Sequence, residues 1–120
     1  MAKTIFVIDD IHTNLYTAEQ ALGDLYNVIT IPSGKKALSI LQKIRPQLIL
    51  LDIDMPEMDG FEVLEHLKSS QEYRDIPVIF LTGAIEPQTE ARGYEMGVVD
   101  FITKPFSNES LLSRIKPYVE

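Results

Sequence analysis

The sequence contains no cysteine, which excludes disulfide bonds and thiol chemistry. It also lacks an apolar run approaching the roughly 18 residues that a membrane span needs, so we expect neither an anchor nor a signal peptide. Basic residues are scarce, with 11 Lys and Arg against 18 Asp and Glu, for a formal net charge of -7. Without a basic cluster to neutralise phosphates, direct nucleic-acid binding is not expected. We expect a cytoplasmic protein without membrane contact, because the lack of cysteine is compatible with that compartment.

A glycine-rich loop with the spacing of a nucleotide cradle is also missing. What is present is an ordinary globular composition, 45% hydrophobic and 24% charged over 120 residues. This length fits one domain, residues 1–120, and is sufficient to bury a core without disulfides or a structural metal.

Short apolar runs alternate with helical patterns along the whole chain, which is typical of repeated βα units. Strands are predicted at residues 3–9, 26–31, 47–52, 76–82 and 98–103. Helices are predicted from near Asn14 to Gly23, from Ser33 to before Pro46, after Met58-Asp59-Gly60, from Pro87 to Gly97, and from Ser107 or Asn108 onward. The pattern predicts a doubly wound α/β fold, with helices on both faces of a parallel sheet.

Polar residues follow these predicted strands at the points where the strands end. Asp52 follows Leu48-Ile49-Leu50-Leu51, and Asp9-Asp10 follow another apolar run. In open α/β sheets this edge binds ligands, and three close carboxylates tolerate full ionisation only with a compensating cation. Hard oxygen ligands suit Mg²⁺, so we expect a magnesium site. Alternatively, Asp9-Asp10 simply end a strand and cap the next helix.

Two further strand ends strengthen the first interpretation. Thr82 follows the fourth predicted strand, and Lys104 follows the fifth. A nucleophilic carboxylate, a metal, an ammonium group and a hydroxyl are what phosphoryl transfer to aspartate requires.

The motifs that surround these residues occur in a recognisable order. They are Asp9-Asp10, Leu51-Asp52-Ile53-Asp54-Met55-Pro56-Glu57-Met58-Asp59-Gly60, Phe80-Leu81-Thr82-Gly83-Ala84, and Gly97-Val98-Val99-Asp100-Phe101-Ile102-Thr103-Lys104-Pro105-Phe106. In these motifs the whole chain resembles a response-regulator receiver domain of two-component signalling, the CheY-like family. The resemblance implies a flavodoxin-like (βα)5 fold whose parallel strands lie in the order 2-1-3-4-5. It also implies an aspartate that accepts a phosphoryl group from a sensor histidine kinase, in a signalling domain rather than an enzyme with its own substrate.

The resemblance also implies a role for each matching residue. The phosphoacceptor would be Asp52. The Mg²⁺ ligands would be Asp10, Asp52 and the main-chain carbonyl of Asp54, with Asp9 acting through water. Lys104 would pair with a phosphoryl oxygen, and Thr82 and Phe101 would form the switch. The Lys104-Pro105 bond is expected to be cis.

The implied output surface comprises the fourth helix, the fifth strand and the fifth helix, through which a homodimer could also form. The implied partners are a sensor histidine kinase or a phosphotransfer protein, and an unknown output protein or effector domain. Tyr94 borders this surface, either as a partner contact or as a packed aromatic residue. The chain is expected to be either a stand-alone regulator or part of a longer one, and its last residues favour the latter.

Two alternatives from other classes remain. One is a receiver-like interaction module that is never phosphorylated. The other is a phosphatase of the haloacid-dehalogenase type, in which Asp52 and Asp54 would be nucleophile and general acid. The Asp54 carboxylate could repel an attacking water, strengthen the cation site, or be a solvated loop carboxylate. His12 and His66 are too scattered to form a metal set, so we expect them on helix surfaces.

Overall fold

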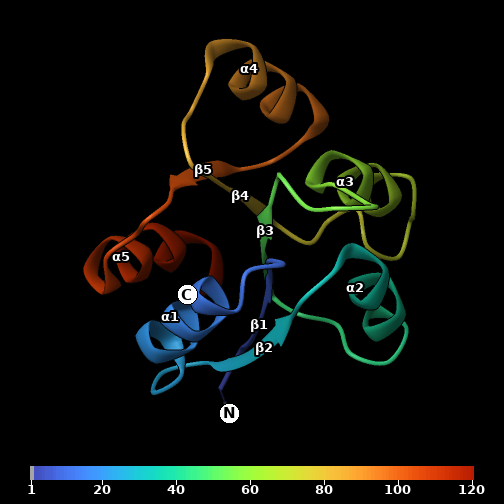
Figure 1. The fold of residues 1–120 in the computed structure, drawn as a ribbon. Helices are drawn as coiled ribbons and strands as arrows, with labels where there is room; N and C mark the ends of the chain where they lie inside the picture. Colours follow the sequence, from blue (N-terminus) through green and yellow to red (C-terminus); the bar gives the residue numbers. More distant parts are fainter. Residues whose placement is uncertain (1) are drawn as a thin grey trace.

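The computed structural model describes residues 2–120 as five parallel strands in the order β2-β1-β3-β4-β5, with helices on both faces (Figure 1). The strands are β1 Thr4–Ile8, β2 Asn27–Ile31, β3 Leu48–Asp52, β4 Val78–Thr82 and β5 Asp100–Thr103. The helices are α1 His12–Leu22, α2 Gly34–Leu41, α3 Gly60–Lys68, α4 Pro87–Met96 and α5 Asn108–Val119. The predicted fold class and strand order are confirmed. No helix within this described range has the combination of length and apolarity that spanning a membrane demands.

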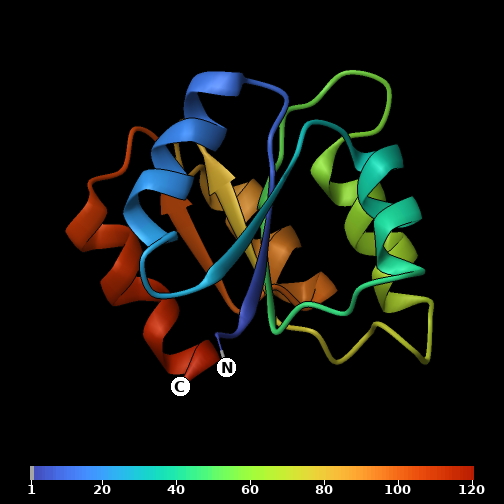
Figure 2. The same cartoon turned by 90° about the horizontal axis from the view of Figure 1, so that it is seen from below.

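The two faces of the sheet support two separate apolar cores. Successive strand residues point to opposite faces, so in β1 Ile5 and Val7 face one core while Phe6 and Ile8 face the other. Helices α1 and α5 cover the first core, and Figure 2 shows them on the opposite side of the strands from α2 and α3. Strands β3 and β4 are buried along their whole length, including Asp52 and Thr82, the polar residues with which they end.

Local sequence signals explain where several helices begin and end. The Ser33 side chain accepts a hydrogen bond from the Lys36 N–H and caps α2, as predicted. Pro87 occupies the start of α4, and Gly97 ends that helix with a φ of 107°, in the left-handed region that favours glycine. These two predicted boundaries are confirmed.

The start of one helix differs from the prediction. Helix α1 begins at His12 rather than near Asn14, because the Asn14 and Leu15 N–H groups both donate to the Ile11 carbonyl and close the first turn there. Helix α2 ends at Leu41 and so stops before Pro46, as predicted; the Lys43 and Ile44 N–H groups both donate to the Ile40 carbonyl and close a turn.

Candidate functional site

The carboxyl ends of β1 and β3 bring three aspartates together. Asp9, Asp10 and Asp52 each offer a carboxylate oxygen, and these atoms all lie within 4.8 Å of one another. Asp9 is 0% exposed and Asp52 is 1% exposed, so their charges are removed from bulk water. The predicted convergence of the strand ends is therefore confirmed for these residues.

Lys104, one residue beyond β5, supplies the positive charge at this cluster. Its Nζ donates to Asp52 Oδ1 at 2.8 Å and to Asp9 Oδ2 at 3.5 Å. The peptide bond that follows it, Lys104-Pro105, is cis, as predicted. One ammonium group thus bridges the ends of β1 and β3, with the shorter contact to Asp52.

Both oxygens of Asp9 also accept hydrogen bonds from residues at the start of α1 and just before it. Its Oδ1 accepts from the Ile11 N–H at 3.0 Å, and its Oδ2 accepts from the Asn14 side-chain amide at 3.0 Å. The alternative in which Asp9-Asp10 cap the next helix is wrong as a cap, because no side chain caps α1; Asp9 instead bonds to Ile11 and Asn14 while also facing Lys104. The sequence predicts Asn14 only as a helix start and gives no sign of its contact with Asp9.

Two oxygens in the cluster have no hydrogen-bond partner. These are Asp10 Oδ1 and Asp52 Oδ2, both buried, among residues 2–120. Buried polar atoms are rarely left unpaired, and an unpaired carboxylate oxygen can be satisfied by a cation. The donor set is therefore suited to a hard divalent cation such as Mg²⁺.

Burial changes the protonation of the central carboxylate. Desolvation raises the pKa of Asp52 from 3.8 to about 6, and the negative charge of Asp9 adds to this rise, while hydrogen bonding to Lys104 opposes it. Desolvation also acts to lower the pKa of Lys104, but its contacts with Asp52 and Asp9 outweigh burial, so the net shift is upward. Lys104 therefore carries its charge while the cation-free Asp52 is only moderately acidic.

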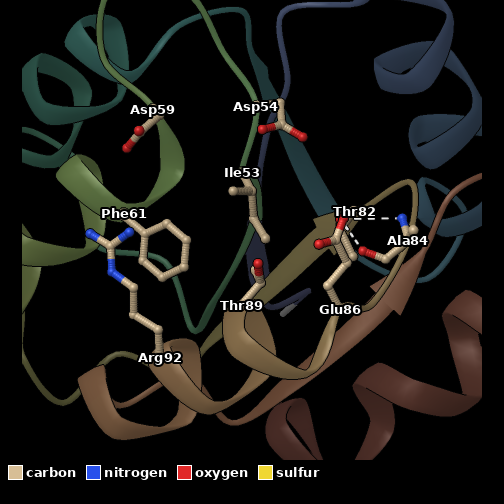
Figure 3. A pocket seen from close by; sticks show the side chains of 9 residues that line it. All are labelled: Ile53, Asp54, Asp59, Phe61, Thr82, Ala84, Glu86, Thr89 and Arg92. Atoms are coloured by element: carbon tan, nitrogen blue, oxygen red, sulfur yellow. Dashed lines mark hydrogen bonds between the residues drawn. The ribbon is translucent and has the colours of Figure 1, made fainter.

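Thr82, at the end of β4, has its hydroxyl turned toward its own loop. The Thr82 Oγ1 donates to the Ala84 carbonyl at 2.9 Å, as the dashed lines in Figure 3 show. It lines a hollow of about 300 Å³ between the β3–α3 loop and α4, together with Asp54, Glu86 and Arg92. The Asp54 carboxylate is exposed there, and His12 and His66 are exposed on their helices, as expected for those two.

A row of aromatic rings connects this hollow with the surface of α4. The Arg92 guanidinium lies 3.9 Å from the centre of the Phe61 ring, which contacts Phe80 edge-on at 5.0 Å. Phe80 contacts Phe101 at 5.7 Å, and Phe101 contacts Tyr94 at 5.3 Å. Phe101 is buried beneath α4, whereas Tyr94 is 46% exposed. Tyr94 thus packs against Phe101 and also presents surface to solvent.

Comparison with known proteins now identifies the class. Residues 5–116 match the family described as "Response regulator receiver domain", and the chain belongs to this family. It is a signalling domain family, and the assignment favours the receiver interpretation over the phosphatase alternative.

Individual relatives agree with this assignment. The chain is 42% identical to a "Probable cyclic di-GMP phosphodiesterase" of Vibrio cholerae, covering 98% of this chain and 26% of that protein. It is 38% identical to "Response regulator PleD" of Caulobacter vibrioides, covering 97% and 26%. The chain therefore spans about a quarter of the length of these two relatives. Among solved structures, chemotaxis protein CheY4 of Vibrio cholerae superposes with a TM-score of 0.93 at 28% identity, covering 98% of this chain and 99% of that one.

Proposed function

We propose that this chain, as a single receiver domain over residues 1–120, accepts a phosphoryl group on Asp52 from the phosphohistidine of a sensor kinase or phosphotransfer protein. The observation that carries the proposal is the state of the Asp52 carboxylate. One of its oxygens is held by Lys104 at 2.8 Å, and the other is buried and unpaired. Lys104 thus holds the carboxylate in one orientation, and the unpaired oxygen stays available to a cation, so the oxygen that Lys104 faces is the one that would attack phosphorus.

The cation proposed for the site is Mg²⁺. Asp10, Asp52 and the main-chain carbonyl of Asp54 would hold it, with Asp9 acting through water. When bound, Mg²⁺ supplies positive charge that neutralises the phosphoryl oxygens. The unpaired oxygens of Asp10 and Asp52 support this ligand set.

Asp52 and Lys104 have different roles in the proposed phosphoryl transfer. An ionised Asp52 oxygen forms a bond to phosphorus while the bond from phosphorus to the donor nitrogen breaks, and an acyl phosphate results. Lys104 already points its ammonium at this carboxylate, so it can donate to a phosphoryl oxygen without a large rearrangement. Asp52 must lose its proton first, because a protonated carboxyl is a poor nucleophile.

The proposed switch consists of Thr82 and Phe101. The Thr82 hydroxyl exchanges its bond to the Ala84 carbonyl for one to the phosphoryl group, and Phe101 moves into the space that Thr82 leaves. This contact exists only in the phosphorylated state, so it can shift the population toward an altered α4–β5–α5 surface. That surface would bind an output protein, an effector domain or a second copy of the chain, and the proposed compartment is the cytoplasm.

The test combines intact-mass analysis with amide chemical shifts. Wild type, Asp52→Asn and Thr82→Ala are incubated with Mg²⁺ and acetyl phosphate, and then with a phosphohistidine donor. We expect one alkali-labile phosphoryl group on wild type and on Thr82→Ala, none on Asp52→Asn, and α4–β5–α5 shift changes in wild type only. No adduct from either donor, with Mg²⁺ binding demonstrated, would favour the unphosphorylated interaction module. Full shift changes in Thr82→Ala would exclude Thr82 as the switch.

A further inference from the structure

Two hydrogen-bond donors converge on one oxygen of Asp9. The Asn14 side-chain nitrogen lies 3.0 Å from Asp9 Oδ2, and the Lys104 Nζ lies 3.5 Å from the same atom. Lys104 is closer to Asp52 Oδ1, at 2.8 Å. The neutral amide thus holds the better position at Asp9, and the ammonium is left nearer to the phosphoacceptor.

Because Asp9 is buried, the competition between Asn14 and Lys104 for its Oδ2 atom affects where Lys104 lies. Asp9 is fully buried, so solvent cannot replace a lost donor at Oδ2 without entering the site. Its other oxygen is already bonded to the Ile11 N–H. If the Asn14 amide were absent, Lys104 would be the remaining donor facing Oδ2, and a hydrogen bond between an ammonium and a carboxylate is about twice as strong as a neutral one. The ammonium would then be drawn toward Asp9 and away from Asp52.

We propose that Asn14 is a positioning residue, which directs Lys104 toward Asp52 by occupying the Asp9 oxygen that would otherwise attract it. The proposal rests on the proposed phosphorylation of Asp52 for its effect on rate, but the displacement of Lys104 is a property of the cation-free protein. Asn14 touches neither Asp52 nor a phosphoryl group in this role, and it acts entirely through Asp9.

The principal variant is Asn14→Leu, which has a similar size and no donor. In a crystal structure of the metal-free variant, we expect the Lys104 Nζ to lie closer to Asp9 Oδ2 than to Asp52 Oδ1. At saturating Mg²⁺ and acetyl phosphate, the phosphorylation rate constant should fall by about tenfold, the scale expected for loss of a hydrogen bond to a charged group. The Mg²⁺ dissociation constant should change by less than about twofold, because the unpaired oxygens of Asp10 and Asp52 remain.

A double-mutant cycle tests the route of the effect. In an Asp9→Asn background the charge that attracts Lys104 is gone, so adding Asn14→Leu should change the rate constant by less than about twofold. Asn27→Leu is the matched control, because the Asn27 amide donates to Thr4 Oγ1 at 3.2 Å in an exposed pair where β1 and β2 begin. It should leave both Lys104 and the rate constant as in wild type.

Several results would overturn the proposal. These are an unmoved Lys104, an unchanged rate constant, or an Asn14→Leu effect that persists in the Asp9→Asn background. If Asn14→Leu does not fold, Asn14→Ala serves in its place, since alanine favours the helix. If wild type takes up no phosphoryl group, the proposed function fails, whereas the position of Lys104 in the metal-free variant still decides this inference.

Discussion

Helices α4 and α5 flank the same strand, β5, but they are attached to it in different ways. Helix α5 buries Leu111, Ile115 and Val119 in the core beneath it. Its Arg114 also donates to Asp100 at 3.0 Å and to the Phe101 carbonyl at 2.9 Å. In α4, by contrast, the residue that is buried is a glycine, Gly93.

This difference indicates that α4 is attached to the sheet less firmly than α5. The attachment of α4 depends on the close approach of Gly93 to Phe101, the edge contact of Tyr94 and the stacking of Arg92 on Phe61. Elements with few buried apolar contacts open at lower free energy than the core. The new hydrogen bond proposed for Thr82 would therefore move α4 more easily than α5.

The largest expected effect comes from truncating a side chain that α5 buries in the core. Ile115→Ala removes a fully buried side chain, and we expect the free energy of unfolding to fall by about 2–5 kcal/mol. Urea denaturation followed by circular dichroism measures this. Tyr94→Ala on α4 is the comparison variant and should lose less than half as much. Equal losses would remove the distinction between the two helices.

An intermediate effect is expected at the closest approach of α4 to the sheet. A Cβ atom added at Gly93 would lie 2.5 Å from Phe101 Cζ. Gly93→Ala should therefore cost about 1–3 kcal/mol through overpacking, partly offset by about 1 kcal/mol of helix propensity. Hydrogen exchange should become faster in α4 and stay unchanged in α5. Gly83→Ala is the control, because its added Cβ would meet no atom within 4 Å. Equal acceleration in both helices would show that α4 does not open independently.

The smallest expected effect concerns the cation–π contact. Arg92→Met keeps an apolar stem over Phe61 but removes the guanidinium, and α4 should open more easily by about 0.5–1 kcal/mol. Native-state hydrogen exchange of α4 amides measures this, with Arg74→Met, at an exposed position, as the matched control. Exchange rates in α4 identical to those of the control variant would assign the stacking no role.

The sequence was informative where structure depends on local pattern. Apolar runs that end on Asp52, Thr82 and Lys104 were sufficient to predict strands whose ends share one edge of the sheet. The strand order, however, followed from the family resemblance, because periodicity alone does not distinguish arrangements of parallel strands. The confirmed caps at Ser33 and Gly97 likewise depend on residue types with strong local preferences.

What could not be predicted depends on contacts between distant residues or on exact helix register. The amide of Asn14 reaches Asp9 from within α1, which begins at His12 and not at the predicted start near Asn14. The signal available was an asparagine five residues after Asp9, which is equally compatible with a helix cap. Arg92 and Phe61 are far apart in sequence and meet only through tertiary packing.

The buried aspartates also make folding itself sensitive to the ionic environment. Because folding raises the pKa of Asp52 from 3.8 to about 6, the folded state retains a proton there that the unfolded chain releases. This difference in pKa costs the folded state no stability below about pH 4. The cost grows as pH rises from about 4 to about 6, and it is complete above about pH 6. A cation that binds only the folded cluster offsets the cost by mass action. If the proposed cation binds, the stability of this domain at neutral pH would follow the free concentration of divalent cations, and the unphosphorylated protein would then respond to its ionic surroundings.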